Sequence, residues 1–182
     1  MIRGLFPALV VACCWPAAVR ADGPPWQPNL VALGAGYFDF DKTGGAKAAD
    51  LRPEYRWGLS LLPLAVPATR GWDRFVQLHP YAGLEGNSNG LFYASGGLSL
   101  DIFATRHVVL TWTEGVGTLH NDGHDQLGSV LEFRSMVEAG WRFDNGMRLT
   151  AAYSHISNAG AATHDPGAEI VGLYVQIPVG WP

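Results

Sequence analysis

The stretch YSHISNAG, residues 153–160, places a histidine and a serine two positions apart in a run that is otherwise typical of a β-strand. Residues two apart on a strand point to the same face, so His155 and Ser157 share a side. An imidazole beside a serine hydroxyl can take its proton and make the oxygen a nucleophile. The pair therefore indicates hydrolytic chemistry, provided that a carboxylate fixes the imidazole.

Glu169 is the carboxylate best placed to complete such a group. It opens the run 169–179, and the other residues of its face are apolar: Val171, Leu173, Val175, Ile177 and Val179. His155 and Ser157 hold the equivalent place at the end of the preceding run, 147–157. If the two runs pair as antiparallel strands, a carboxylate, an imidazole and a hydroxyl meet at one end of an apolar face, as a serine hydrolase requires.

Eight runs of alternating polarity follow the N-terminal segment and are separated by clusters of Gly, Asn, Asp and Pro, which is the strand-and-turn pattern. Most of them have 10 residues or more. Strands of soluble proteins centre on about 5–6 residues, whereas strands that cross a membrane need about 9–11. The runs are 29–41, 47–61, 75–86, 91–103, 107–119, 129–143, 147–157 and 169–179.

The two faces of these runs differ in polarity. In 129–143, one face is apolar and the other carries Glu132, Arg134, Met136, Glu138 and Arg142. In 47–61, one face is apolar and the other carries Asp50, Arg52, Glu54, Arg56 and Ser60. A soluble sandwich turns its apolar face inward, whereas a small membrane barrel turns that face to lipid around a polar lumen.

Two features favour the barrel. The polar faces carry both charge signs, so they can fill a narrow eight-stranded lumen with ion pairs. The apolar faces end in aromatic residues typical of a membrane-interface girdle: Trp57, Trp112, Trp141 and Phe143. We therefore predict an all-β fold, an eight-stranded antiparallel transmembrane β-barrel of the outer-membrane type.

The connections fit this topology with one exception. The short turns 104–106 and 144–146 would face the periplasm, and the longer connections 120–128 and 158–168 would face outward. The connection 62–74 is long where a short turn is expected.

Residues 1–21 have the features of a secretory signal peptide: a basic start, an apolar stretch and the small-residue cleavage pattern Val19-Arg20-Ala21. The alternatives are a membrane anchor, which Pro7 and Pro16 disfavour, and a lipoprotein signal at Cys13. The mature chain, 22–182, would form a single domain.

Cleavage would remove both cysteines, Cys13 and Cys14, so the mature protein would have no thiol for a disulfide or a metal. It would also remove Arg3 and Arg20 and take the formal charge from −4 to −6, which disfavours nucleic-acid binding. No metal or other cofactor is expected. The His120–Asp125 loop contains potential ligands, but its Gly- and Asn-rich spacing is more typical of a solvated turn.

The pattern alone leaves the function open. Polar groups at the headgroup level of a membrane cost little, so the chain could be a non-enzymatic barrel with a structural or loop-binding role. A soluble lipocalin-like carrier is a third possibility, which the charged faces of 47–61 and 129–143 disfavour.

HISNAG, followed by Asp165-Pro166-Gly167 and Glu169, closely resembles the signature of the lipid A 3-O-deacylases, as does the upstream segment LGSVLEFRSMVEAGWRFDNGMRLTAAYSH. The match is close over about 125–179. The resemblance implies an outer-membrane enzyme that hydrolyses the 3-O-linked acyl chain of lipid A, its partner in the outer leaflet. Ser157 would be the nucleophile, His155 the general base and Glu169 the acid that orients it. It implies nothing about the oligomeric state.

The resemblance also suggests residues that position the substrate. Asn158 follows the nucleophile and is the natural candidate to hold the oxyanion, through its backbone N–H or its side chain. Gly160 would let the backbone approach the substrate closely. The family usually has Asn where this chain has Asp165.

Overall fold

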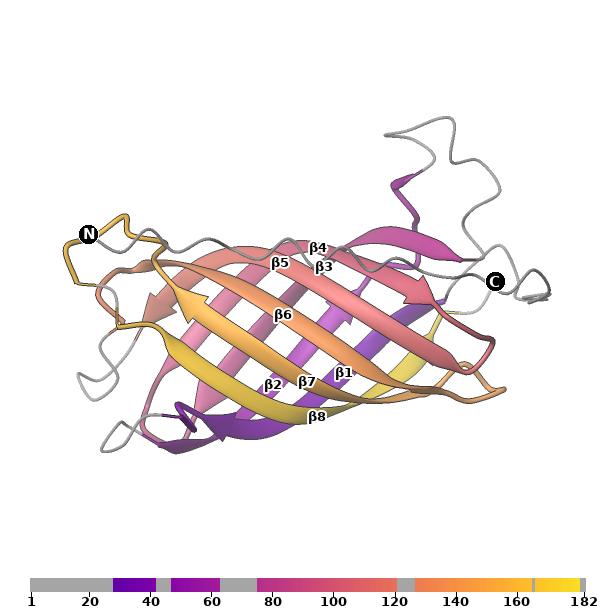
Figure 1. Ribbon diagram of the computed structural model, residues 1–182, viewed down its shortest axis with the longest axis horizontal. Helices are drawn as coiled ribbons and strands as arrows, with labels where there is room; N and C mark the ends of the chain where they lie inside the picture. The colour runs from indigo at the N-terminus through magenta and orange to yellow at the C-terminus, as the bar shows by residue number, and fades with distance from the viewer. Residues whose placement is uncertain (1–27, 42–46, 63–74, 121–126, 165, 181–182) are drawn as a thin grey trace.

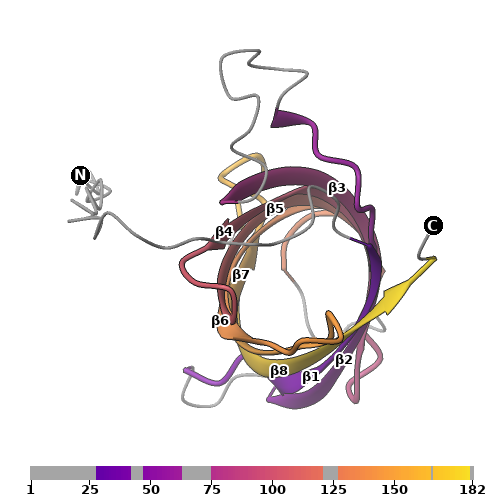
Figure 2. The same cartoon turned by 90° about the vertical axis from the view of Figure 1, so that its right-hand side faces the viewer.

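The computed structural model describes residues 28–41, 47–62, 75–120, 127–164 and 166–180, and the predicted signal peptide lies outside them. Its strands form a closed antiparallel barrel in which β8 returns to pair with β1 (Figures 1 and 2). Each of the eight predicted runs forms a strand, so the predicted β-barrel is confirmed. The strands are β1 (Asn29–Phe38), β2 (Ala48–Arg56), β3 (Val76–Asn87), β4 (Phe92–Phe103), β5 (Val108–His120), β6 (Leu131–Arg142), β7 (Arg148–Ser157) and β8 (Ala168–Val179).

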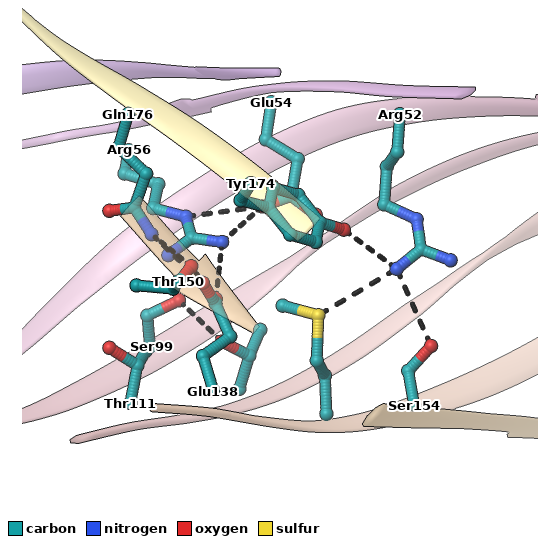
Figure 3. A network of polar contacts seen from close by, with 12 residues as sticks. Arg52, Glu54, Arg56, Ser99, Thr111, Glu138, Thr150, Ser154, Tyr174 and Gln176 are labelled. Carbon is teal, nitrogen blue, oxygen red and sulfur yellow. Dashed lines mark hydrogen bonds and ion pairs between the residues drawn. The ribbon is translucent and has the colours of Figure 1, made fainter. Parts of the chain in front are cut away.

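Charged side chains fill the inside of the barrel, as the polar faces predicted (Figure 3). Arg56 lies 2.7 Å from Glu54 and 2.6 Å from Glu138, and all three are buried. Arg134 forms a further ion pair with Glu54. Removing one partner from such a network leaves a buried charge without compensation, so the network tolerates few single substitutions.

The outer face of the barrel is apolar. Its most exposed strand residues include Leu51, Trp112, Leu149 and Leu173, which are 65%, 55%, 47% and 60% exposed. This is the inverted arrangement of a lipid-facing barrel, with polar residues inside and apolar residues outside.

No helix among the described residues is long and apolar enough to cross a membrane.

The two ends of the barrel differ in their connections. The end that carries the β7–β8 loop, here called the site end, also carries the β1–β2, β3–β4 and β5–β6 connections. At the opposite end, β6 and β7 are joined by a tight turn in which Gly146 has a φ of 82°, a conformation that glycine adopts without strain. The long connection between β2 and β3 also lies at that opposite end, as predicted, and its residues 63–74 are outside the described part of the chain.

Candidate active site

β7 and β8 place His155 and Glu169 directly opposite each other on the outer face of the barrel. The two residues are cross-strand partners, and His155 Nδ1 donates a hydrogen bond of 2.6 Å to Glu169 Oε1. The side chains are 43% and 21% exposed, so the pair is open to the surroundings of the barrel. Because Nδ1 faces the carboxylate, Nε2 is the ring nitrogen that can serve a hydroxyl group.

Ser157 is the last residue of β7 and lies two positions beyond His155, so the two side chains share the outer face. It is partly exposed, and its cross-strand partner on β6 is Phe133. The strand period therefore brings the predicted nucleophile, base and acid to one corner of the barrel, at the site end.

Gly167 packs against the imidazole from the β7–β8 loop. A Cβ added to Gly167 would lie 2.9 Å from Cε1 of His155 and 3.3 Å from the carbonyl oxygen of Ile156. Its φ of +60° also lies in the left-handed region, so two constraints require glycine here. The sequence contained this residue within the quoted motif, but only the packing shows that it supports His155.

Asn158 is fully buried and holds the loop after β7 together. Its Nδ2 donates to the carbonyl oxygens of Leu127 and His164, at 3.2 and 2.8 Å. Its Oδ1 accepts from the backbone N–H groups of Gly160 and Ala162, at 3.0 and 3.4 Å. Both amide hydrogens thus serve the loop, so the Asn158 side chain holds the backbone that follows Ser157.

Two consecutive residues of this loop have positive φ angles, 55° at Ala159 and 77° at Gly160. A positive φ costs energy for a residue with a side chain, and the Asn158 hydrogen bonds hold the backbone in this conformation. Nothing lies within 4 Å of a Cβ added to Gly160. Its conformation, rather than crowding within the chain, is therefore the structural reason for glycine at this position.

Sequence reasoning missed two polar residues that continue the site across the outer face. Glu114 on β5 pairs with Ser135 on β6, and Ser135 pairs with His155. The Glu114 carboxylate accepts hydrogen bonds from Trp112 Nε1, at 2.6 Å, and from Ser135 Oγ, at 2.8 Å. Glu114 and Ser135 lie on the outer faces of their strands, where the alternation of polarity predicts apolar side chains. Their polarity at these two positions was the signal in the sequence that could have identified them.

The remaining polar candidates lie on loops or outside the described residues. His164 is exposed, and its carbonyl oxygen is bound by Asn158. Asp165 and residues 121–126 are outside the described chain. Among the described residues, no three His, Cys, Asp or Glu side chains are grouped so that they could hold a metal ion.

The family model of the lipid A 3-O-deacylases (PagL) matches residues 25–178. The chain belongs to the PagL family. This confirms the predicted family, and the PagL-family barrel is a protein of the bacterial outer membrane.

A curated relative, "Lipid A deacylase PagL" of Pseudomonas aeruginosa, is 37% identical over 57 residues. The aligned segment covers 31% of this chain and 33% of that protein, so it spans about a third of the relative's length.

Solved structures share the fold of this PagL-family chain. The crystal structure of the outer membrane enzyme PagL superimposes with a TM-score of 0.65 at 22% identity and covers 82% of this chain and 99% of that one. A de novo designed transmembrane β-barrel gives a TM-score of 0.53 at 11% identity, covering 85% and 98% of the two chains. Neisserial surface protein A gives 0.50 at 12% identity, covering 83% and 97%.

Proposed function

We propose that this chain is an outer-membrane serine esterase that hydrolyses the 3-O-linked acyl chain of lipid A. Ser157 is the nucleophile, His155 the general base and Glu169 the residue that orients the imidazole. The observation that carries the proposal is the 2.6 Å contact between His155 and Glu169 on an apolar outer face, two residues from Ser157. Membership in the PagL family supports the choice of substrate.

In the first half of the reaction, His155 Nε2 takes the Ser157 hydroxyl proton while Oγ attacks the ester carbonyl carbon. The tetrahedral intermediate collapses as the bond to the sugar oxygen breaks, and His155 returns the proton to that oxygen. The products are a free 3-hydroxyl on the sugar and an acyl group on Ser157. Glu169 stabilises the imidazolium that forms between the two proton transfers.

In the second half, His155 takes a proton from water, and the resulting hydroxide attacks the acyl carbonyl. The Ser157 oxygen leaves and recovers the proton from His155, which releases the fatty acid. In both halves a hydrogen-bond donor must stabilise the negative charge that develops on the carbonyl oxygen. We propose Asn158, the residue that follows the nucleophile, for this role, and we assign substrate positioning to the turn at Gly160.

The position of the site on the outer face suits a substrate that stays in the membrane. Moving an acyl chain from lipid into water costs about 0.8 kcal/mol per methylene, so extraction of a whole chain is prohibitive. A nucleophile on the outside of the barrel meets the ester from the side, without extraction.

Mass spectrometry of lipid A incubated with the purified, folded barrel in detergent tests the proposal. The expected result is the loss of one 3-hydroxyacyl group, together with free fatty acid, and no such loss with Ser157→Ala. Folding is checked separately by heat-modifiable migration in gels. If the folded wild-type protein releases no acyl group, the chain is a non-enzymatic barrel and the proposal is wrong.

A further inference from the structure

Three side chains on the outer face of β5 and β6 form a hydrogen-bonded group beside the candidate active site, here called the Glu114 network. Trp112 Nε1 and Ser135 Oγ both donate to the Glu114 carboxylate, at 2.6 and 2.8 Å. All three side chains are exposed on a face whose other exposed residues are mostly apolar. A carboxylate on the lipid-facing side of a membrane protein is costly and usually has a functional reason.

The register of the barrel brings the Glu114 network to the candidate catalytic group. Ser135 is the cross-strand partner of both Glu114 and His155. Glu169 therefore occupies the β8 side of His155, and Ser135 occupies its β6 side. An ester that Ser157 attacks must come within reach of the His155 imidazole, so it lies close to Ser135.

Ser135 lies farther from the site end of the barrel than Ser157 does. Ser157 pairs with Phe133, and Ser135 is two residues beyond Phe133 along β6, which begins at the site end with Leu131. Diagonal neighbours of this kind lie about 7–8 Å apart. An acyl chain that extends from the ester into the membrane runs away from the site end, so its first carbons pass from the level of Ser157 to that of Ser135.

The hydrogen bond to Glu114 decides what Ser135 can offer to a ligand. A serine hydroxyl has one hydrogen to donate and two lone pairs that accept. Because the Ser135 hydrogen is bound to the Glu114 carboxylate, the Ser135 oxygen can only accept from a ligand. Donation to a carboxylate also polarises the hydroxyl and strengthens its oxygen as an acceptor. Ser135 therefore suits a ligand group that donates a hydrogen bond.

We propose that Ser135 accepts a hydrogen bond from the hydroxyl on carbon 3 of the acyl chain, and that this bond makes the enzyme prefer 3-hydroxyacyl esters. This inference rests on the proposed esterase function. Glu114 and Trp112 are positioning residues that fix the Ser135 hydroxyl. Because water is scarce among acyl chains, a hydroxyl group there depends on the protein for its partner.

The reach of such a substrate matches the separation of the two serines. In a reactive complex the carbonyl carbon lies about 3 Å from the Ser157 oxygen. The hydroxyl oxygen on carbon 3 is three bonds from that carbon, about 3–4 Å away. With a hydrogen bond of about 2.8 Å, the extended arrangement spans about 9 Å. A slightly bent arrangement therefore bridges the gap of about 7–8 Å between Ser157 and Ser135.

Two esters that differ in a single group test the proposal. Both are synthetic 3-O-acyl glucosamine phosphates of equal chain length in detergent micelles, and carbon 3 of the chain carries either a hydroxyl or a fluorine. Fluorine also withdraws electrons from the carbonyl group, but it has no hydrogen to donate. The readout is the ratio of kcat/KM for the hydroxy ester to that for the fluoro ester, measured on barrels shown to be folded by heat-modifiable migration.

The wild-type barrel should prefer the hydroxy ester about tenfold, the effect expected of one hydrogen bond in a network that includes a charge. Ser135→Ala should bring the ratio close to one, and Glu114→Leu should lower it severalfold because the Ser135 hydroxyl is then free to rotate. Ser135→Thr retains a hydroxyl and should keep the wild-type ratio. The control is Thr118→Ala, which removes another exposed hydroxyl from β5 and should also keep it.

Two results would overturn this inference and leave the esterase intact. In one, the wild-type barrel hydrolyses both esters equally well; in the other, folded Ser135→Ala keeps the wild-type ratio. If Ser135→Ala loses the preference but Glu114→Leu keeps it, the positioning role of Glu114 is wrong. If the folded wild-type barrel hydrolyses neither ester nor lipid A, the proposed function itself is wrong and the role of Ser135 falls with it.

Discussion

Ser157 and His155 should each be indispensable to hydrolysis. Ser157→Ala removes the atom that forms the covalent intermediate, and His155→Ala leaves the hydroxyl protonated. We expect each to lower kcat by about 10⁴–10⁶, and the double variant to be scarcely worse, since residues that act as one unit are non-additive. Release of fatty acid from lipid A by purified protein measures this.

Glu169→Ala should lower kcat by a factor that is tens of times smaller than the factor for Ser157→Ala. The reason is that the carboxylate only orients and stabilises the imidazole. The exposed His164 serves as the control, and His164→Ala should retain nearly wild-type kcat. Substantial turnover by folded Ser157→Ala would contradict the serine mechanism.

Gly167→Ala and Gly160→Ala form a matched pair, since both glycines have positive φ angles, +60° and +77°. A Cβ at Gly167 would meet the imidazole at 2.9 Å, whereas nothing lies within 4 Å of one at Gly160. Gly167→Ala should therefore displace His155 and lower kcat at least about tenfold more than Gly160→Ala does. Equal kcat values for the two folded variants would show that packing at Gly167 does not hold the base.

At the scale of the strand, substitutions on β8 test which of its two faces contacts lipid. Leu173 is 60% exposed and Val175 is 40% exposed, both on the outer face. Arginine near the bilayer midplane costs about 2–4 kcal/mol, so Leu173→Arg and Val175→Arg should impair barrel assembly, seen as loss of heat-modifiable migration. Normal migration of both variants would overturn the assignment of faces.

The control for that experiment depends on packing between β1 and β8. Gly172 faces the lumen, so alternation alone suggests that Gly172→Ser is harmless. However, a Cβ at Gly172 would lie 2.8 Å from the carbonyl oxygen of Ala35, so serine would force the two strands apart. Ser154→Ala is the better control, because it removes only a 3.4 Å hydrogen bond from Arg52 inside the barrel.

At the scale of the whole molecule, replacing a glutamate by leucine should have different effects on the free energy of unfolding in the lumen and on the outer face. Glu54 is buried in the lumen between Arg56 and Arg134. Glu54→Leu would leave both cations without this partner and should lower the free energy of unfolding by about 3–5 kcal/mol. Urea titration of the barrel in lipid vesicles measures the change.

Glu114→Leu is the matched substitution on the outer face, where an apolar residue suits the lipid and a carboxylate does not. It should leave the free energy of unfolding unchanged or raise it, although it removes the partner of Trp112 and Ser135. A loss as large as that of Glu54→Leu would mean that Glu114 is part of the structural framework.

The sequence by itself determined the strands, their two faces and the candidate catalytic group. A period of two fixes which residues share a side, so Glu54 and Arg56 had to face the lumen if Leu51 faced outward. The same period put His155 beside Ser157, and the chain order of two adjacent strands brought Glu169 to them.

Only the tertiary structure decided what depends on register. Alternation leaves open which residue lies opposite which, because a pairing shifted by two residues keeps every side chain on its face. The pairing of Ser157 with Phe133 and the line from His155 through Ser135 to Glu114 follow from one particular register around a tilted barrel. The loop role of Asn158 and the contact of Gly167 with His155 likewise required the chain to be folded, since their partners lie across a turn whose geometry no spacing in the sequence specifies.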